Sequence, residues 1–474
     1  MKKYIYSIPL LLVIFAGSGC KKYLDINHDP NNPLSSKENL LLFPIETAIS
    51  TDIAGGALTL GNYTTITVTD AYWVQQLALN QTPPNVDCYR LRPADLDQIF
   101  LTSYSTCMYN LLLLNNLAEQ NNNHSYGVIS KVLSAYMMGV VTDHWGDIPY
   151  SQGFYGKLKV PYDKQEDVYK AMQALLDSAI LESTLPTGKL KPSTDDQIFQ
   201  GDMSSWVKFA YSLKARYYIH LTKAPGYDAV TQSQLALNAL ANGFTSNAGE
   251  AKYAYYTGNA SQESPWYLNI DPGQGGVVMS STFIDSLKAR NDPRLPILTV
   301  QGSEGDDSGR VIGTAPAGDF SIYSTVGDFY ANSAAPSYIF NYAELLFIKA
   351  EAVFRISGAA AATPYYINGI NAHMAKVGLD TTSSEVTDYI ASRSPLTSAN
   401  AMELIMQEKA LANFLNMENY TDWRRTGHPA LTIVKSPYVP SIPRRYPYPF
   451  QESSSNPQPQ QSATLTDRVW WDAQ

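Results

Sequence analysis

Apolar residues recur at helical spacing in several long stretches of the chain. The clearest stretch runs from Asp163 to Leu185, where Asp163 and Glu166 resemble a capping box and predict a helix start. The apolar face of this predicted helix consists of Val168, Met172, Leu175, Leu176, Ala179 and Ile180. A second clear stretch follows Ser204, the predicted N-cap, with Trp206, Phe209, Ala210, Leu213 and Tyr217 at the same spacing.

Other stretches with this periodicity predict further helices. They cover residues 39–49 (beginning near Ser36), about 71–77, 95–119, 126–141, 338–356, 365–377 and 398–417. Because neighbouring helices form pairs, the pattern favours a tetratricopeptide-like scaffold, although no clean period of about 34 residues can be read. The predicted fold class is therefore mostly α, with paired helices.

The periodicity disappears in residues 243–336, which are rich in Gly, Ser, Asp and aromatic residues. We interpret them as an irregular, loop-rich lobe packed on the helical scaffold. The last part of the chain, 436–474, begins as a Pro-rich tail. The prediction is one domain, residues 36–474, with its scaffold in 36–242 and 337–435.

The first 35 residues have a different pattern. Two lysines precede an apolar run from Tyr4 to Phe15, which is too short to span a membrane and ends in small residues; this predicts a signal peptide over 1–19. Cys20 follows directly and resembles the acylated cysteine of a bacterial lipobox, so residues 20–35 are interpreted as a lipidated, turn-rich leader. The alternative is an ordinary cleaved signal followed by a chance cysteine.

Charge and cysteine content narrow the functional classes. The net charge is −9, and −11 without the two lysines of the predicted signal; an acidic chain with no basic stripe is a poor partner for nucleic acid. No later stretch is long and apolar enough to span a bilayer. Cys88 and Cys107 could pair in an oxidising compartment, or could both be free thiols.

The sequence contains no recognisable catalytic motif, phosphate loop or metal-ligand spacing, so we predict no catalytic residue, no metal and no cofactor. His144, between Asp143 and Asp147, is interpreted as a structural histidine. The Asp306–Asp307 pair is interpreted as part of a solvated loop and not as a cation site. Glycosidases use two carboxyl groups that face each other in the folded protein, and their separation cannot be read from positions along the chain. A glycoside hydrolase is therefore kept as an alternative.

The aromatic content suggests a binding surface. With 33 Tyr and 7 Trp, the chain has many side chains that combine a flat apolar ring with a polar group, and sugar rings can stack on such faces. The predicted ligand contacts are aromatic residues expected on exposed loops: Tyr63, Trp73, Tyr89, Trp266, Tyr267 and Tyr330. For each of them, ordinary packing is the alternative.

Several segments, in order along the chain, resemble the SusD/RagB family of nutrient-binding outer-membrane lipoproteins of Bacteroidetes. They are 20–33, 143–150 (DHWGDIPY), 290–296 (RNDPRLP), 341–344 with 349–352, 407–409 (QEK), 422–427 (DWRRTG), 442–447 (IPRRYP) and 470–472 (WWD). We interpret these motif residues mainly as fold residues, and Arg424 and Arg425 as candidates for a buried ion pair with Glu408.

The resemblance implies a function that spacing alone does not give. It implies a non-enzymatic lipoprotein, anchored in the outer membrane and facing the cell surface, that binds an oligosaccharide or a peptide. It also implies a partner, a SusC-like TonB-dependent transporter that receives the ligand. Lys21 and Lys22 stand where this family often has acidic residues that help export to the cell surface. The sequence therefore does not decide which leaflet of the outer membrane the lipid anchor occupies. A surface glycoside hydrolase and a structural or adhesive lipoprotein are the alternatives.

Overall fold

A computed structural model describes residues 37–58, 64–259, 262–271, 276–316 and 318–473. Among these residues, no helix is both long and apolar enough to cross a membrane. The predicted signal peptide, the leader with Cys20, and Tyr63 lie outside the described residues. Predictions about those positions are therefore not addressed by the structure.

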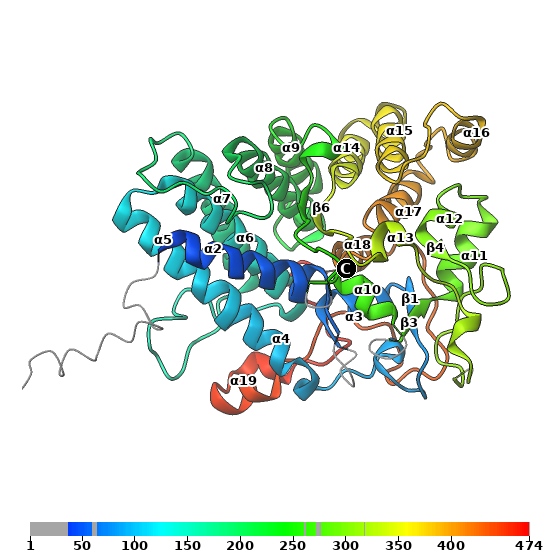
Figure 1. Ribbon diagram of the computed structural model, residues 1–474, viewed down its shortest axis with the longest axis horizontal. Helices are drawn as coiled ribbons and strands as arrows, with labels where there is room; N and C mark the ends of the chain where they lie inside the picture. Colours follow the sequence, from blue (N-terminus) through cyan, green and yellow to red (C-terminus); the bar gives the residue numbers. More distant parts are fainter. Residues whose placement is uncertain (1–36, 59–63, 260–261, 272–275, 317, 474) are drawn as a thin grey trace, which may run out of the picture.

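The fold is mostly helical and its helices pack in pairs, as predicted (Figure 1). Consecutive helices pack against each other as α5 with α6, α6 with α7, α8 with α9, and α14 with α15. Their bounds are Tyr109–Asn121 (α5), His124–Trp145 (α6), Gln165–Glu182 (α7), Met203–His220 (α8), Ala229–Leu240 (α9), Tyr342–Ser357 (α14) and Ala359–Lys376 (α15). This row continues into α16 (Ser384–Ser392), α17 (Ala401–Ala412) and α18 (Glu418–Thr426), while α2 (Glu38–Ala48) packs on α5. The scaffold is therefore a curved stack of helical hairpins.

Helix ends differ from the sequence predictions. The Asp163 carboxylate accepts hydrogen bonds from the backbone N–H groups of Tyr150 (3.1 Å) and Ser151 (2.7 Å), so it fastens the preceding loop and does not cap α7. The N-cap of α7 is Lys164, without a side-chain cap. At α8 the cap is Asp202, whose side chain accepts a hydrogen bond from the Ser204 N–H at 3.0 Å; the prediction of Ser204 was wrong by two residues.

Two other predictions need correction. Residues 337–340 form strand β6 and not the start of α14, because Ser337–Phe340 pairs with β2 (Ala251–Tyr253). The predicted helix 95–119 is divided into α4 (Asp97–Leu101), a wider π-helical segment Thr102–Met108, and α5. The hydrophobic pattern also does not predict α9, α16 or α18.

The lobe has more regular structure than expected. Two further antiparallel ladders join β1 (Leu77–Leu79) to β3 (Val277–Met279) and β4 (Thr299–Val300) to β5 (Thr325–Val326). Its helices are short: α10 (Pro265–Ile270), α11 (Ser281–Ala289), α12 (Leu295–Leu298) and α13 (Asp328–Ala331). Because β1 directly follows α3 (Ile66–Trp73), the β1–β3 ladder ties the lobe to the N-terminal part of the chain.

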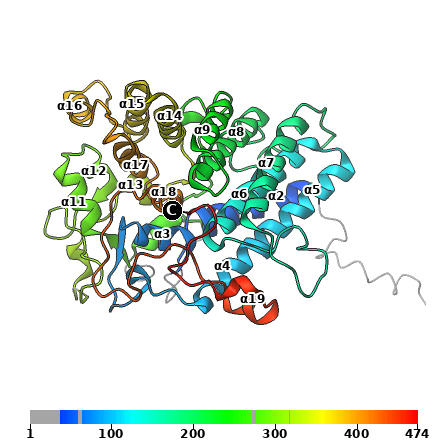
Figure 2. The same cartoon turned by 180° about the vertical axis from the view of Figure 1, so that it is seen from behind.

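The segment after α18 runs along the lobe, forms α19 (Phe450–Ser455), and returns to the centre of the molecule (Figure 2). There Trp471 is fully buried; its indole N–H donates to Asp143 at 2.8 Å and its ring lies 4.7 Å from the Arg424 guanidinium carbon. The motif residues at 143, 424 and 471 therefore meet in one buried cluster.

The motif arginines form buried ion pairs, but not with the predicted partner. Arg425 binds Glu351 and Asp422, and Glu408 is bound instead by Arg294 at 2.8 Å. Arg424 donates to backbone carbonyl groups, including that of Arg444 at 3.1 Å. Spacing along the chain could not reveal which carboxylate would face which arginine.

The remaining chemical predictions concern His144 and the two cysteines. His144 is buried between the Asp70 carboxylate (2.7 Å) and the carbonyl oxygen of Val140 (2.6 Å), which confirms a structural histidine. Cys88 and Cys107 are both free and buried, and burial raises the pKa of each thiol to about 12. No group of three or more potential metal ligands occurs among the described residues.

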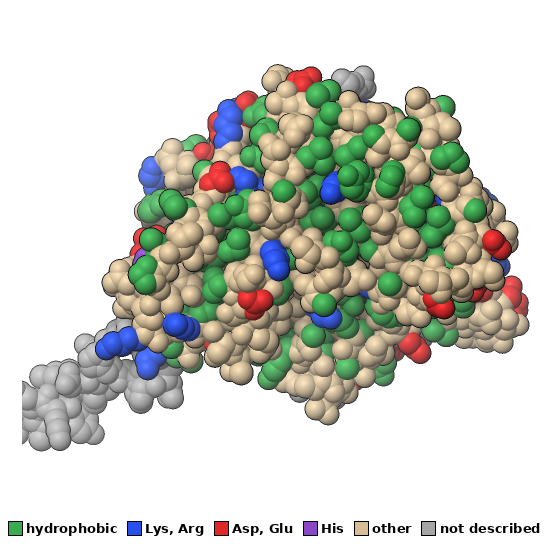
Figure 3. Space-filling model, turned by 90° about the horizontal axis from the view of Figure 1, so that it is seen from above, with side chains coloured by type: hydrophobic (Ala, Val, Ile, Leu, Met, Phe, Trp, Pro, Cys, Tyr) green, Lys and Arg blue, Asp and Glu red, His purple; other side chains and the backbone are tan. Residues whose placement is uncertain are grey.

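The distribution of basic side chains on one face of the molecule is relevant to the prediction that the protein does not bind nucleic acid. In the view from above, Lys and Arg side chains lie singly or in small groups among apolar, polar and acidic groups (Figure 3). The described residues of this face form no basic stripe, the feature that phosphate backbones require.

Glu46, on the buried face of α2, gives a pH-dependent prediction. Burial and the neighbouring Asp196 charge raise its pKa well above the ordinary value. A carboxyl group whose pKa is raised by folding stabilises the protein below its unfolded pKa of about 4.3, and this contribution is lost as the pH rises through the folded pKa. The free energy of unfolding of Glu46→Gln, relative to that of the wild type, is therefore expected to increase by up to about 1.4 kcal/mol for each pH unit above about pH 4.3.

Urea denaturation of both proteins at several pH values between 4.5 and 8 measures this difference. Glu304→Gln, which changes an exposed loop carboxylate, is the control and should follow the wild type throughout. Parallel curves for Glu46→Gln and the wild type would show that Glu46 is ionised in the folded protein.

Candidate functional site

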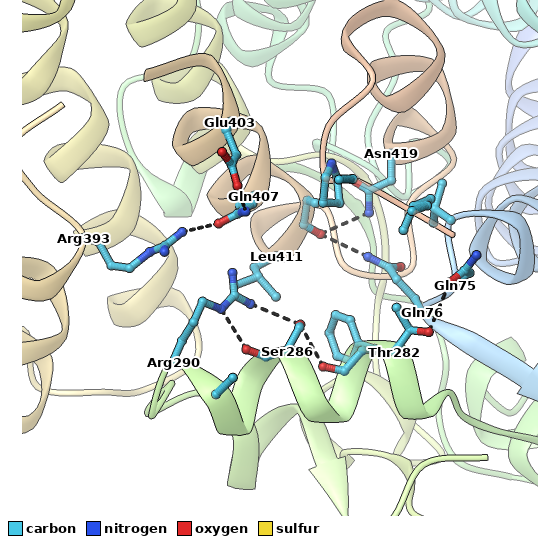
Figure 4. Close-up of a pocket in the computed structure, with 17 residues that line it drawn as sticks. Gln75, Gln76, Thr282, Ser286, Arg290, Arg393, Glu403, Gln407, Leu411 and Asn419 are labelled. Atoms are coloured by element: carbon cyan, nitrogen blue, oxygen red, sulfur yellow. Dashed lines mark hydrogen bonds between the residues drawn. The ribbon is translucent and has the colours of Figure 1, made fainter. Parts of the chain in front are cut away.

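A cavity of about 480 Å³ lies where the helical scaffold meets the lobe (Figure 4). Its walls come from α11 of the lobe, from α17 and α18 of the scaffold, from the turn between α3 and β1, and from the loop 429–431. Cavities formed between separately positioned elements are common sites for small ligands. We therefore take this cavity as the candidate site.

Two amphipathic helix faces line opposite sides of the cavity. Helix α17 contributes Glu403, Gln407, Ala410 and Leu411, and α11 contributes Thr282, Phe283, Ser286 and Ala289. Both sets recur at spacings of three and four residues, which places each set on one face of its helix. The cavity therefore has polar groups and small apolar patches on both sides.

The third wall is the turn after α3, which contributes Val74, Gln75 and Gln76. Gln75 has a left-handed backbone (φ 59°), a conformation that costs energy for a residue other than glycine and that often occurs at functional sites. Ser280, the N-cap of α11, bonds to this turn: its N–H donates to the Gln76 carbonyl at 3.1 Å and its hydroxyl to the Gln75 carbonyl. The same hydroxyl accepts the Phe283 N–H at 3.1 Å, so one serine fixes α11 against the turn.

Stacked aromatic rings support α11 from behind. Phe283 is stacked on Phe414, with ring centroids 5.1 Å apart and planes at 14°. Phe414 in turn packs edge-on against Tyr330 at 5.4 Å. Because all three rings are buried, α11 has a rigid base.

Most polar groups in the walls are already hydrogen-bonded to one another. The side-chain amides of Gln76 and Asn419 both donate to the Ala410 carbonyl at 3.1 Å. Gln407 donates to Glu403 at 2.9 Å and accepts from Arg393, whose guanidinium also lies 3.3 Å from Glu408. These bonds hold the wall in one geometry before any ligand arrives, which lowers the cost of binding.

None of the predicted aromatic contacts that the structure describes is among the residues that line this cavity. Trp73, Tyr89, Trp266 and Tyr330 are all at most 4% exposed, so the expectation that they stand on exposed loops is wrong. Trp73 directly precedes the wall residues 74–76, and the Tyr89 hydroxyl accepts the Val434 N–H at 3.2 Å. Tyr267, on α10, is 40% exposed and remains a predicted contact that the structure does not test.

Sequence reasoning missed the residues that line the cavity. Arg290 and Gln407 lie within two of the family-like segments, where they are interpreted as fold residues, and Gln75 and Gln76 follow Trp73. The available signal was the pair of glutamines at the end of an aromatic helix, together with polar residues at helical spacing in 282–290 and 403–411. Only the fold brings these segments together.

Comparison with known proteins gives the following matches. A family model described as "Starch-binding associating with outer membrane" (SusD-like) matches residues 42–449. Solved structures with the same fold include a chitin-binding protein (21% identity, 92% of this chain and 100% of that chain, TM-score 0.78) and a SusD/RagB family protein from Bacteroides thetaiotaomicron (22%, 92% and 99%, 0.73). A chitin-binding SusD homologue from Flavobacterium johnsoniae matches with 22% identity, 92% and 98% coverage and a TM-score of 0.75. No curated protein matches the sequence. At these identities the structural likeness concerns the fold.

Proposed function

This chain belongs to the SusD-like family, and from that premise we propose that it is a non-enzymatic surface protein that binds a glycan. The observation that carries the proposal is the preformed cavity between scaffold and lobe. Two of the similar structures are described as chitin-binding, which supports a saccharide in preference to a peptide.

The cavity has the chemistry that a sugar needs. Amide, hydroxyl and guanidinium groups can bond to sugar hydroxyl groups, and apolar side chains such as Leu411 and Leu431 can pack against the C–H faces of a ring. The exposed ring of Tyr267 lies outside this lining, and we propose it as an additional contact for a longer ligand.

The distribution of carboxylates supports binding without cleavage. Hydrolysis of a glycosidic bond generally requires two carboxyl groups, about 5 to 9.5 Å apart, on either side of the bond. Among the described residues that line the cavity, Glu403 is the one carboxylate. A glycan in this cavity would therefore meet one acid, which is hydrogen-bonded to Gln407.

We extend the proposal to anchoring and delivery. Acylation of Cys20 would hold the protein at the outer membrane, because each buried CH₂ group contributes about 0.8 kcal/mol. The anchored protein would then pass its ligand to a SusC-like TonB-dependent transporter, the partner that the family resemblance implies.

The cavity can be tested by filling it. Ala289 lies at its exposed edge on α11, so Ala289→Trp should occupy the space without disturbing the core. We expect glycan affinity to fall at least about tenfold, equivalent to about 1.4 kcal/mol, in calorimetric titrations with ligands found on a glycan array.

Ala360→Trp is the matched control, since it adds the same side chain to an exposed position of α15. It should bind like the wild type. Undiminished binding by Ala289→Trp would place the ligand elsewhere, a peptide hit without a glycan hit would contradict the ligand class, and product formed by the wild type would favour the hydrolase alternative.

A further inference from the structure

Arg290 occupies an unusual position in the cavity. It follows the last residue of α11, and its side chain extends from that helix toward Leu411 of α17 (Figure 4). Its Nε donates to the Ser286 carbonyl at 3.0 Å, and one Nη lies 3.4 Å from the Ser286 hydroxyl. These contacts orient the half-buried guanidinium but use only part of its five N–H donors.

Arg290 is the partner in no close ion pair among the described residues; the nearby Asp292 carboxylate, whose pKa the Arg290 charge helps to lower, is itself bound by Arg294 at 2.7 Å. No carboxylate among the described residues lies within ion-pairing distance of it, although the chain has 43 acidic and 34 basic residues. The other arginine of the lining, Arg393, is paired with Glu408 at 3.3 Å. Lys288, on another face of α11, donates to the Asp307 carbonyl group outside the cavity. Arg290 is thus the cation of the lining that remains available to a ligand.

The wall opposite Arg290 carries a negative charge, so the two sides of the cavity differ in charge. Glu403 of α17 is exposed at the rim, where one of its oxygens accepts a hydrogen bond from Gln407 at 2.9 Å. The end of the cavity near α11 is therefore positive and the rim near α17 is negative (Figure 4). A ligand with one anionic group would be bound with that group toward α11.

We propose that the cavity selects an acidic saccharide, and that Arg290 binds its carboxylate or sulfate group. A guanidinium presents parallel N–H donors that match two oxygens of such a group, and partial burial strengthens the interaction. This inference rests on the proposed function and specifies its ligand class.

Binding of four hexasaccharides tests the inference by calorimetry. A galacturonate hexamer supplies carboxylates, its fully methyl-esterified form is the neutral counterpart, a carrageenan hexamer supplies sulfate without carboxylate, and a chitin hexamer is neutral. We expect at least one anionic hexamer to bind about tenfold more tightly than the neutral ones. The preference should weaken between about 50 and 500 mM salt, because salt screens accessible charges.

Three variants assign the preference to a residue. Arg290→Gln should reduce the preference for anionic hexamers to within twofold, because the anionic hexamers lose more affinity than the neutral ones. Lys288→Gln removes the same charge two residues away and should retain the full preference. Glu403→Gln removes the opposing charge and should tighten the anionic complex roughly twofold. Unchanged thermal melting of each variant confirms that it is folded.

The outcomes separate this inference from the proposed function. If neutral hexamers bind as tightly as anionic ones, or if Arg290→Gln keeps the preference, the inference is wrong and glycan binding stands. If no glycan on the array binds at all, the proposed function fails and this inference fails with it. Binding of the carboxylate form alone or the sulfate form alone identifies which acid Arg290 recognises.

Discussion

Arg425→Met is expected to lower the free energy of unfolding by about 3 to 5 kcal/mol. Arg425 is fully buried and binds Glu351 and Asp422, each at 2.7 Å from Nη2. Burial raises the pKa of Glu351, but the charges of Arg425 and Arg355 outweigh this effect and hold that pKa at about 2. Methionine would keep most of the volume and remove the charge, which would leave two buried carboxylates with too few cations.

Chemical denaturation at neutral pH measures this loss. Lys170→Met is the control, because Lys170 pairs with Glu166 at 2.8 Å on the exposed side of α7, where such a pair contributes less than about 1 kcal/mol. A change below about 1 kcal/mol in Arg425→Met would mean that Lys409, 2.7 Å from Asp422, and Arg355 together compensate for the missing arginine.

Trp73→Ala is expected to destabilise the protein by about 3 to 5 kcal/mol, the range for deletion of a large buried ring. Its indole is fully buried, donates to the Val86 carbonyl at 3.0 Å, and meets Tyr420 and Tyr446 edge-on at 5.5 and 5.2 Å. The cavity left behind would lie directly beneath the wall residues 74–76, so ligand binding should weaken together with stability.

Tyr267→Ala distinguishes packing from ligand contact. Its ring is 40% exposed, so the variant should stay within about 0.5 kcal/mol of the wild type and, if Tyr267 contacts the glycan, should lose affinity alone. Chemical denaturation measures the stability of Trp73→Ala and Tyr267→Ala, and calorimetry measures their affinity for the glycan. Normal stability of Trp73→Ala would contradict the packing role assigned to this ring.

The sequence predicts the long scaffold helices well because each buries one face. Helices α7 and α8 have apolar residues such as Val168, Met172, Phe209 and Leu213 at the core-facing spacing, and all four are fully buried. The helix ends were less predictable, since Asp163 and Asp202 are equally good capping residues and only their neighbours decide which one caps. Strand β6 was mistaken for helix because its partner β2 lies more than 80 residues earlier in the chain.

The candidate site was harder to predict for a geometric reason. Trp266 and Tyr267 are adjacent and chemically alike, yet α10 directs one into the core and the other outward, so they are 4% and 40% exposed. Aromatic content therefore indicated a binding protein without indicating which rings face solvent. The walls come from residues near 75, 286 and 407, each with too few polar positions to stand out in the sequence.

The contact between Asp143 and Trp471 has a consequence for biosynthesis. The two residues are 328 positions apart, and a ribosome needs roughly 16 to 66 s to add that many residues. During this interval the emerging N-terminal helices would carry Asp143 without its indole donor, and Arg424 would be made only shortly before Trp471. Until translation is almost complete, the Asp143 carboxylate therefore relies on donors that are made earlier, such as the Tyr169 hydroxyl group.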